Sequence, residues 1–289
     1  MQQYISSPKR TTQILTDYGI RLRKNLGQNY MIDTNSIKKM VSLAKINKDE
    51  TVLEIGSGIG SLTEVLLESG AGKVLCVEID KKVSGAFRNL FKKELDTGRA
   101  ELIISDAMDL DYRKLSSEYG IKKMVSNIPY KIAAPLMLNI STEAPGIGRF
   151  WMTIQKDIAD RMIANKGDKN YSSYSVKANL MAEYRICFKI SRNCFIPRPF
   201  VDSVVVEAAR KMLPEVIETD EEVKAFFDLV NNSFLHRRKK MLNSLSLNNR
   251  YKAKLDLITG ILKKLDKDLS VRAEDLTLED YIYIFENLK

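Results

Sequence analysis

The first two-thirds of the chain alternates short apolar runs, rich in β-branched residues, with stretches of helical periodicity. This alternation predicts strands joined by crossover helices, and therefore an α/β domain built on a mostly parallel sheet. Strands are expected at residues 51–55, 73–79, 101–104, 123–126, 149–154, 185–190 and 203–208, and helices at 61–68, 81–95, 133–140, 157–164 and 173–182. Seven strands fit a doubly wound sheet.

The last connection of this sheet differs from the others. Residues 195–200 are few and contain two prolines, so they leave no room for a crossover helix, and strands 185–190 and 203–208 are expected to pair as an antiparallel hairpin. After Pro214 the β-branched runs stop. Helices are expected there at 221–231, 237–244, 252–264 and 277–288, the last with Thr277 and Asp280 as an approximate capping box. The predicted organisation is a basic lead (1–35), an α/β domain (36–212) and a small all-α domain (213–289).

The composition of the chain favours a polyanionic partner. The formal charge is +9 over 289 residues, which is typical of nucleic-acid binding but also of a Lys-rich cytosolic protein. Clustering favours nucleic acid: basic residues gather at Lys9-Arg10, at Arg21, Arg23 and Lys24, and at Arg237, Arg238, Lys239 and Lys240. A solvated helix face is the plainer interpretation of that last run.

Other classes of site and location are disfavoured by what the sequence contains. Three cysteines without paired spacing and one histidine, His236, indicate neither a disulfide framework nor a metal site. No apolar stretch approaches eighteen residues, and the N-terminus has no signal-peptide core, so we expect a cytoplasmic protein without a membrane span. No heptad seam is visible, and a monomer is expected.

A glycine-rich turn, Gly56-Ser57-Gly58-Ile59-Gly60, follows the first predicted strand and opens a helix. Its third glycine comes one residue earlier than in the dinucleotide fingerprint, a spacing more usual for S-adenosylmethionine. Glu78 ends the second strand, where a carboxylate can accept ribose hydroxyls, and Asp106 follows the third, where it can accept from an adenine amine. Because the carboxyl ends of parallel strands share one edge, these groups predict one cofactor crevice.

Asn127-Ile128-Pro129-Tyr130 stands at the end of the fourth strand, on the rim of the same crevice. The amine of an aromatic base is a poor nucleophile because its lone pair is delocalised into the ring. The side-chain oxygen of Asn127 and a backbone carbonyl near Pro129 can accept its two hydrogens, and Tyr130 can stack on the extruded base. Phe195 is a candidate second stacking ring. A strand-terminating turn is the alternative interpretation of the motif.

These motifs together resemble one family. Residues 24–33 (KNLGQNYMID), the glycine turn, Asn127 to Tyr130, residues 195–203 (FIPRPFVDS) and the 237–245 segment are similar to the ribosomal RNA adenine-N6 dimethyltransferases. Within them the chain resembles the small-subunit enzyme that dimethylates two adjacent adenosines near the 3′ end of 16S rRNA, with four methyl groups in total. The resemblance implies a Rossmann-like fold, S-adenosylmethionine as cofactor, 16S rRNA in the small subunit as partner, and Asn29 and the backbone of Met31 as further cofactor contacts.

Three alternatives remain open at this point. The large-subunit rRNA adenine methyltransferase of macrolide resistance shares the fold and cofactor, and the 237–245 segment and the long N-terminal lead argue against it. A mitochondrial transcription-factor relative would bind DNA with little need for methylation, whereas the intact Asn127 to Tyr130 motif favours catalysis. A nicotinamide oxidoreductase is disfavoured by the early third glycine.

Overall fold

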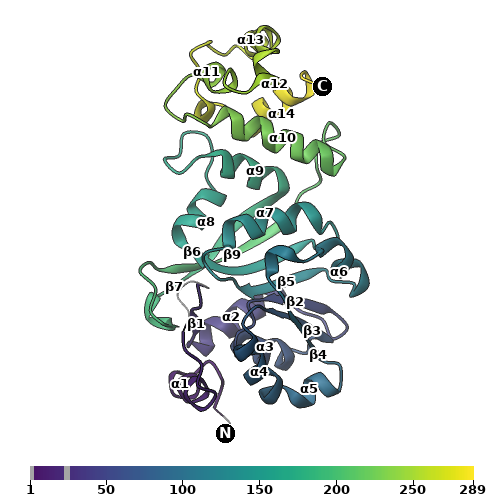
Figure 1. Ribbon diagram of the computed structural model, residues 1–289, viewed down its shortest axis with the longest axis vertical. Coiled ribbons are helices and arrows are strands. Elements are labelled where there is room, and N and C mark those ends of the chain that lie inside the picture. The colour runs from purple at the N-terminus through teal and green to yellow at the C-terminus, as the bar shows by residue number, and fades with distance from the viewer. Residues whose placement is uncertain (1–2, 23–26) are drawn as a thin grey trace. The chain divides into compact units, whose positions relative to one another are not determined.

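The computed structural model describes residues 3–22 and 27–289, so Arg23 and Lys24 of the second basic cluster lie outside the described residues (Figure 1). The chain divides into two compact units. One comprises Met1–Ala159 with Tyr184–Arg210, and the other comprises Asp160–Glu183 with Lys211–Lys289. We call them the α/β unit and the helical unit. The helical unit thus also contains residues 160–183, which lie before the last two strands in the sequence.

The α/β unit contains the expected seven-stranded sheet, in the order β4-β3-β2-β5-β6-β9-β7. Strands β2 to β6 pair in parallel and β9 runs antiparallel to β6. At the edge, β7 and β9 are neighbours, as the short connection between them requires. The strands are β2 (Thr51–Ile55), β3 (Lys73–Glu78), β4 (Ala100–Ile104), β5 (Lys123–Asn127), β6 (Arg149–Gln155), β7 (Ala182–Ile190) and β9 (Ser203–Arg210).

The crossover helices expected from the sequence are present with one break, and α6 (Tyr112–Glu118), between β4 and β5, is a crossover helix that the sequence pattern did not predict. The expected helix at 81–95 divides at Phe91, where φ is −112°. The ring of Phe91 stacks on Phe87 at 4.6 Å and fills the space beside Gly60, where a Cβ would lie 2.0 Å from it. The helices before β9 are α1 (Pro8–Asp17), α2 (Thr34–Ala44), α3 (Ser61–Glu68), α4 (Lys81–Leu90), α5 (Lys92–Asp96), α6 (Tyr112–Glu118), α7 (Ala133–Glu143), α8 (Lys156–Met162) and α9 (Ser173–Met181).

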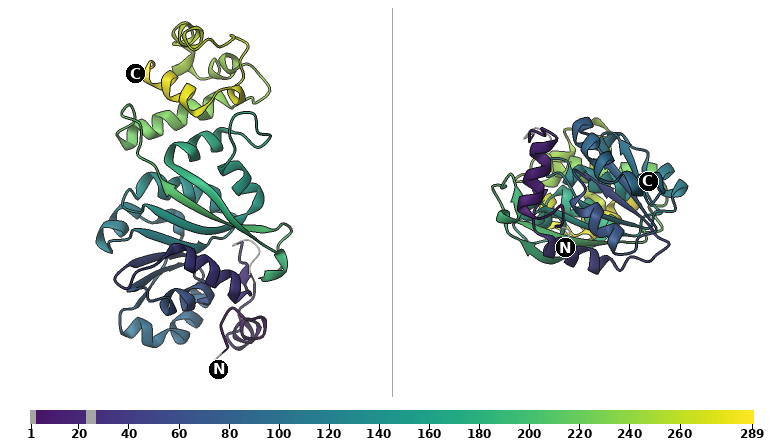
Figure 2. Two further views of the ribbon diagram at one scale, coloured as in Figure 1. Left: turned by 180° about the vertical axis from the view of Figure 1, so that it is seen from behind. Right: turned by 90° about the horizontal axis from the view of Figure 1, so that it is seen from below.

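The N-terminal segment is attached to the outside of the α/β unit, where Figure 2 shows α1 in dark purple. The backbone N–H of Ile5 donates to Glu64 Oε2 at 2.8 Å, and the Tyr4 hydroxyl donates to Glu68. Further along, β1 (Tyr30–Met31) pairs antiparallel with β8 (Phe195–Ile196). This small second sheet brings residues 30–31 and 195–196 together beside the end of β5.

The helical unit has its own core, in which α9 packs with the C-terminal helices. They are α10 (Asp220–Ser233), α11 (Met241–Leu245), α12 (Asn249–Lys252), α13 (Leu255–Lys264) and α14 (Leu278–Glu286). The capping box of Thr277 and Asp280 is present. The helix expected at 252–264 is two helices, and the basic run 237–240 is not helical: it lies in the turn before α11. None of the helices in the described ranges is long and apolar enough to span a bilayer.

Candidate active site

A cavity of about 210 Å³ opens in the α/β unit at the carboxyl ends of β2, β3 and β5. Nine of the residues that the sequence suggests for the site line it: Asn29, Met31, Gly56, Gly58, Glu78, Asp106, Asn127, Pro129 and Tyr130. Phe195 is not among the described residues that line it; it is 2% exposed and lies in the core. The cavity therefore joins the glycine turn, both carboxylates and the Asn127 motif.

The glycine turn is confined on two sides. Gly56 (φ 73°) approaches Pro129 so closely that a Cβ would lie 2.9 Å from the proline Cδ. At Gly58 (φ 57°) a Cβ would lie 3.0 Å from the ring of Tyr30. Both positions combine a left-handed backbone with close packing, which only glycine accepts without strain. The turn is thereby held against the segments that carry the other site residues.

Glu78 is a buried carboxylate of the site, with 7% of its surface exposed. Its Oε2 accepts from the Gly58 N–H at 2.9 Å and its Oε1 from the Asp80 N–H at 2.8 Å. Burial raises the pKa of Glu78, and these two backbone bonds act in the opposite direction. Since a carboxylate has about four acceptor positions, Glu78 can bind the turn and still accept from ligand hydroxyls.

Asp106 also has a local structural role. Its Oδ1 accepts from the Met108 N–H at 2.9 Å and caps the short 3₁₀ helix Ala107–Asp109. Its carboxylate lies at the cavity with Ile79, whose side chain is 43% exposed. An acceptor next to an exposed apolar side chain suits a flat base with an amine at its edge.

The orientation of Asn127 is fixed by the N-terminal segment. Its Nδ2 donates to the backbone carbonyl of Asn29 at 3.0 Å, and Asn29 Nδ2 donates to the Gly27 carbonyl at 2.9 Å. Because the donor end of the Asn127 amide is bound in this way, its oxygen occupies the other end and is left to accept. No sequence motif indicates that Asn29 positions Asn127.

Tyr130 is held at the rim by two contacts. Its hydroxyl hydrogen-bonds the Ser203 hydroxyl at the start of β9, and its ring meets Phe195 edge to face at 6.4 Å. Burial raises the pKa of Tyr130, and the Ser203 bond opposes that effect. Phe195 therefore supports the ring of Tyr130 from the core. It does not line the cavity, so its role as a second stacking ring stays a prediction.

Further polar residues that sequence reasoning did not select also line the cavity, among them Tyr30, Glu54, Ser57 and Ser61. The hydroxyls of Tyr30, Ser57 and Ser61 are buried and have no hydrogen-bond partner in the described part of the chain. An unsatisfied buried polar group costs about 1–3 kcal/mol, so three at one cavity fit a polar ligand. Ser57 lies within the glycine turn and Ser61 directly follows it, and this position was the signal that could have identified them.

This donor and acceptor set fits S-adenosylmethionine. Glu78 would accept from the ribose hydroxyls and Asp106 from the adenine amine, as their positions at successive strand ends require. The glycine turn allows close approach, and the buried hydroxyls supply partners for the polar groups of the methionine part.

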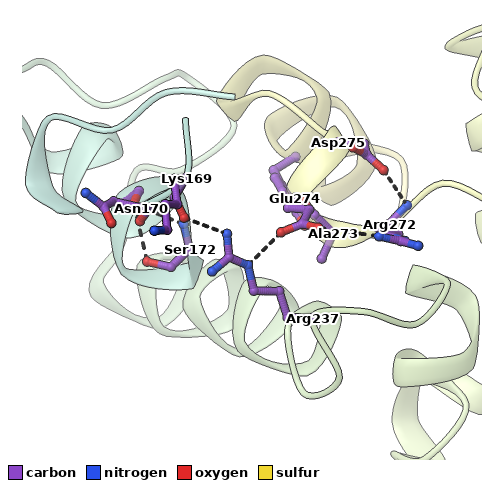
Figure 3. A network of polar contacts seen from close by, with 10 residues as sticks. Lys169, Asn170, Ser172, Arg237, Arg272, Ala273, Glu274 and Asp275 are labelled. Atoms are coloured by element: carbon purple, nitrogen blue, oxygen red, sulfur yellow. Dashed lines mark hydrogen bonds and ion pairs between the residues drawn. The ribbon is translucent and has the colours of Figure 1, made fainter. Parts of the chain in front are cut away.

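The basic run of the helical unit divides into two parts. Arg237 is engaged internally: its Nε lies 2.6 Å from Glu274 Oε2 and its Nη2 donates to the Lys169 carbonyl at 2.8 Å (Figure 3). Arg238, Lys239 and Lys240 are exposed. They line a hollow of about 650 Å³ with Asn243, Asp268, Ser270, Val271, Arg272 and Asp275.

Residues 19–289 match the family described as Ribosomal RNA adenine dimethylase. The chain is 35% identical to Ribosomal RNA small subunit methyltransferase A of Geobacillus sp. (strain WCH70), over 97% of the chain and 96% of that protein. It is 33% identical to the protein of the same name from Ligilactobacillus salivarius (strain UCC118), over 98% and 96%.

Two solved structures extend the comparison to the fold. A dimethyladenosine transferase from Plasmodium falciparum is 27% identical with a TM-score of 0.69, covering 88% of this chain and 95% of its own. The 23S rRNA methyltransferase ErmE, at 22% identity, a TM-score of 0.63 and coverages of 89% and 98%, shares the fold. A match over most of both units, on a site built for a nucleoside cofactor and an aromatic amine, leads to one conclusion: this chain belongs to the ribosomal RNA adenine dimethylase family.

Proposed function

We propose that this protein dimethylates the N6 amines of two adjacent adenosines near the 3′ end of 16S rRNA, during biogenesis of the small ribosomal subunit. The single observation that carries the reaction is the Asn127 amide, clamped by Asn29 at the rim of the cofactor cavity. The small-subunit substrate is supported by the names of the curated relatives. The protein acts in the cytoplasm as a monomer.

The chain's own residues supply positioning and hydrogen-bond acceptors. Asn127 Oδ1 and the backbone carbonyl near Pro129 accept the two N6 hydrogens, which localises the nitrogen lone pair toward the cofactor. Bound S-adenosylmethionine supplies a methyl group activated by a sulfonium. No base with a perturbed pKa is needed beforehand, because the amine proton becomes acidic only as the new N–C bond forms. Tyr130, fixed by Ser203, stacks on the extruded base.

The proposal is tested by incubating the protein with methyl-labelled cofactor and 30S subunits from a strain that lacks this modification. Label is expected on two adjacent adenosines of 16S rRNA, up to four methyl groups per subunit. The competing activity is methylation of 23S rRNA, because the 23S rRNA methyltransferase ErmE shares the fold of this chain. In a parallel incubation with 50S precursors, label confined to their 23S rRNA, or no label on either RNA, would reject the assignment.

Glu78→Gln is expected to weaken cofactor binding by about ten- to a hundredfold. The substitution replaces charge-assisted bonds to the ribose with neutral ones, and one of the two backbone N–H donors then faces an NH₂ group. Isothermal titration with S-adenosylmethionine measures the loss. Glu101→Gln, a change on the neighbouring strand at the far end from the cavity, is the matched control and should bind normally.

We assign rRNA contact to Arg238, Lys239 and Lys240, whose exposed side chains share one hollow. The double variant Arg238→Ala/Lys239→Ala should bind 30S subunits more weakly, with a salt dependence flattened by about 0.7–0.9 per lost phosphate contact. Lys263→Ala, an exposed lysine on α13, is the matched control. A double variant with wild-type affinity and salt slope would mean that this run is a solvated surface.

Arg237 is expected to behave differently from the other members of the run. Its guanidinium joins the 169 loop to Glu274, so Arg237→Ala should lower thermal stability as well as RNA affinity. We therefore propose that Arg237 stabilises the shape of this surface and that Arg238, Lys239 and Lys240 contact the phosphates.

A further inference from the structure

Phe200 is an aromatic side chain that the protein leaves in solvent. It is 98% exposed, and the next residue, Val201, is 41% exposed. Other residues of the 195–203 segment anchor it: Phe195, Pro199 and Ser203 are all buried. Phe200 is therefore an almost fully exposed ring on a loop that these buried residues hold in place.

Both ends of this loop are fixed to the active site. On one side Phe195 and Ile196 pair with Met31 and Tyr30, two residues that line the cofactor cavity. On the other side the Ser203 hydroxyl bonds Tyr130. Three residues of chain span at most about 11 Å, so the backbone of Phe200 lies within that distance of Ser203.

The tip is also held from within the loop. The Asp202 carboxylate accepts from the Arg192 N–H at 3.0 Å, and the Asp202 carbonyl accepts from the Lys156 N–H at 3.2 Å. Arg192 Nη1 donates to the Phe200 carbonyl at 3.4 Å. These bonds hold the backbone at Phe200, so little ordering remains to be done when the ring meets a partner.

The charge around the ring indicates what that partner is. Arg192 and Arg198, on the same loop, are exposed, and the carboxylate of Asp202 is bound to the loop backbone. An exposed ring on a loop that also carries exposed cations is the combination that binds unpaired nucleotides: the ring stacks on a base and the cations meet phosphates. The two exposed arginines therefore favour a nucleic acid as the partner.

We infer that Phe200 is a base-stacking residue that holds an unpaired nucleotide flanking the target adenosine, with Arg192 and Arg198 as contacts to its phosphates. The inference rests on the proposed function, since it requires an RNA substrate at this rim. It assigns Phe200 a role distinct from that of Tyr130: Tyr130 holds the base that is methylated, and Phe200 fixes the strand beside it. Phe200 is a specificity-determining residue and takes no part in the chemistry.

The test is a substitution series at one exposed position, assayed on undermethylated 30S subunits. Phe200→Leu keeps an apolar side chain without a ring, and Phe200→Tyr keeps the ring. The leucine variant should raise KM for 30S subunits about 5- to 150-fold, the range measured for loss of one base–aromatic stack, with kcat nearly unchanged. The tyrosine variant should restore KM. Cofactor affinity should stay at the wild-type value in both, because Phe200 is outside the cavity lining.

A second measurement identifies the contact as RNA. Trp151 is the only tryptophan and is 3% exposed, so Phe200→Trp adds one solvent-exposed reporter. Its fluorescence should be quenched by 30S subunits and also by protein-free 16S rRNA, as stacking on a base requires. Quenching by the subunit alone would place Phe200 against a ribosomal protein and overturn the inference.

The outcomes separate this inference from the proposed function. If the wild-type protein methylates 16S rRNA and Phe200→Leu has the same KM, the stacking role is wrong and the proposed function stands. If the wild-type protein labels no 16S rRNA, the proposed function fails, independently of Phe200. Met212→Ala is the matched control for removing an exposed apolar side chain, since Met212 is 96% exposed on the helical unit. An equal rise in KM for Met212→Ala would mean that loss of any exposed apolar side chain has this effect, and would overturn the inference.

Discussion

Asn127→Ala is expected to lower kcat for methyl transfer by at least about 10²- to 10³-fold, while affinity for 30S subunits stays close to the wild-type value. The magnitude is that of removing one preorganised hydrogen-bonding group from a site where charge develops. The alanine also frees the Asn29 carbonyl, which Asn127 Nδ2 now satisfies at 3.0 Å. Single-turnover methylation measures the first property and filter binding over a range of salt concentrations measures the second.

Two further variants make this result specific. Asn127→Asp keeps an acceptor but loses the donor to Asn29, and two carboxylate oxygens facing that carbonyl repel it. We therefore expect Asn127→Asp to be nearly as inactive as the alanine variant, which would identify orientation by Asn29 as part of the requirement. Asn193→Ala, at an exposed position, is the matched control. Equal loss of activity and of RNA affinity in Asn127→Ala would show that the residue binds substrate generally and has no special part in transfer.

The sequence was sufficient to predict the elements whose cause is local. Strands β2 and β3 are apolar runs that pair in the centre of the sheet, and the glycines between β2 and α3 form the expected turn, with a left-handed backbone. The cap of α14 depends on two residues three positions apart. In each case the residue types that define the element lie within a short window of the sequence, although the pairing of β2 with β3 joins separate segments.

The failures have the opposite cause. Phe91 ends α4 because its ring lies against Gly60, thirty-one positions earlier. Phe195 is in the core because β8 pairs with β1 across the whole domain. Arg237 looked like part of a uniform basic run, yet its partners are the Lys169 carbonyl and Glu274. Contacts between distant segments decide whether a side chain is a surface group, and residue type alone does not contain that information.

The protonation state of Glu54 is likewise not evident from the sequence. Its carboxyl lies at the end of an apolar strand and is fully buried below the cofactor turn. Burial raises the pKa of Glu54 to about 8, although the Thr63 hydroxyl donates to Oε2 at 2.6 Å and opposes the shift. In the unfolded chain the pKa of this carboxyl is near its ordinary value of 4.5. Between these two values the folded state holds a proton that the unfolded state has lost. Stability from this group is therefore complete below pH 4.5 and is lost as pH rises to about 8.

Glu54→Gln is expected to remove that loss. Its amide oxygen can still accept from Thr63, and it carries no charge at any pH, so the variant should match the wild type near pH 5 and exceed it in stability near pH 8. The wild-type slope attributable to Glu54 is about 1 kcal/mol per pH unit. Urea unfolding followed by the fluorescence of Trp151, which lies in β6, reports on the α/β unit.

Two other carboxylates determine the pH dependence that remains in Glu54→Gln and provide the control variant. The pKa of Glu78 is also raised by burial, so Glu54→Gln should flatten the pH profile without abolishing its slope. Glu101 differs: partial burial would raise its pKa, but bonds from Tyr119 and Lys73 outweigh burial and lower it. Its stabilising contribution is therefore fully present from pH 5 to 8, and Glu101→Gln should lower stability by a constant amount across that range. A Glu54→Gln profile parallel to that of the wild type would mean that Glu54 is already ionised in the folded protein, with water reaching it below the glycine turn.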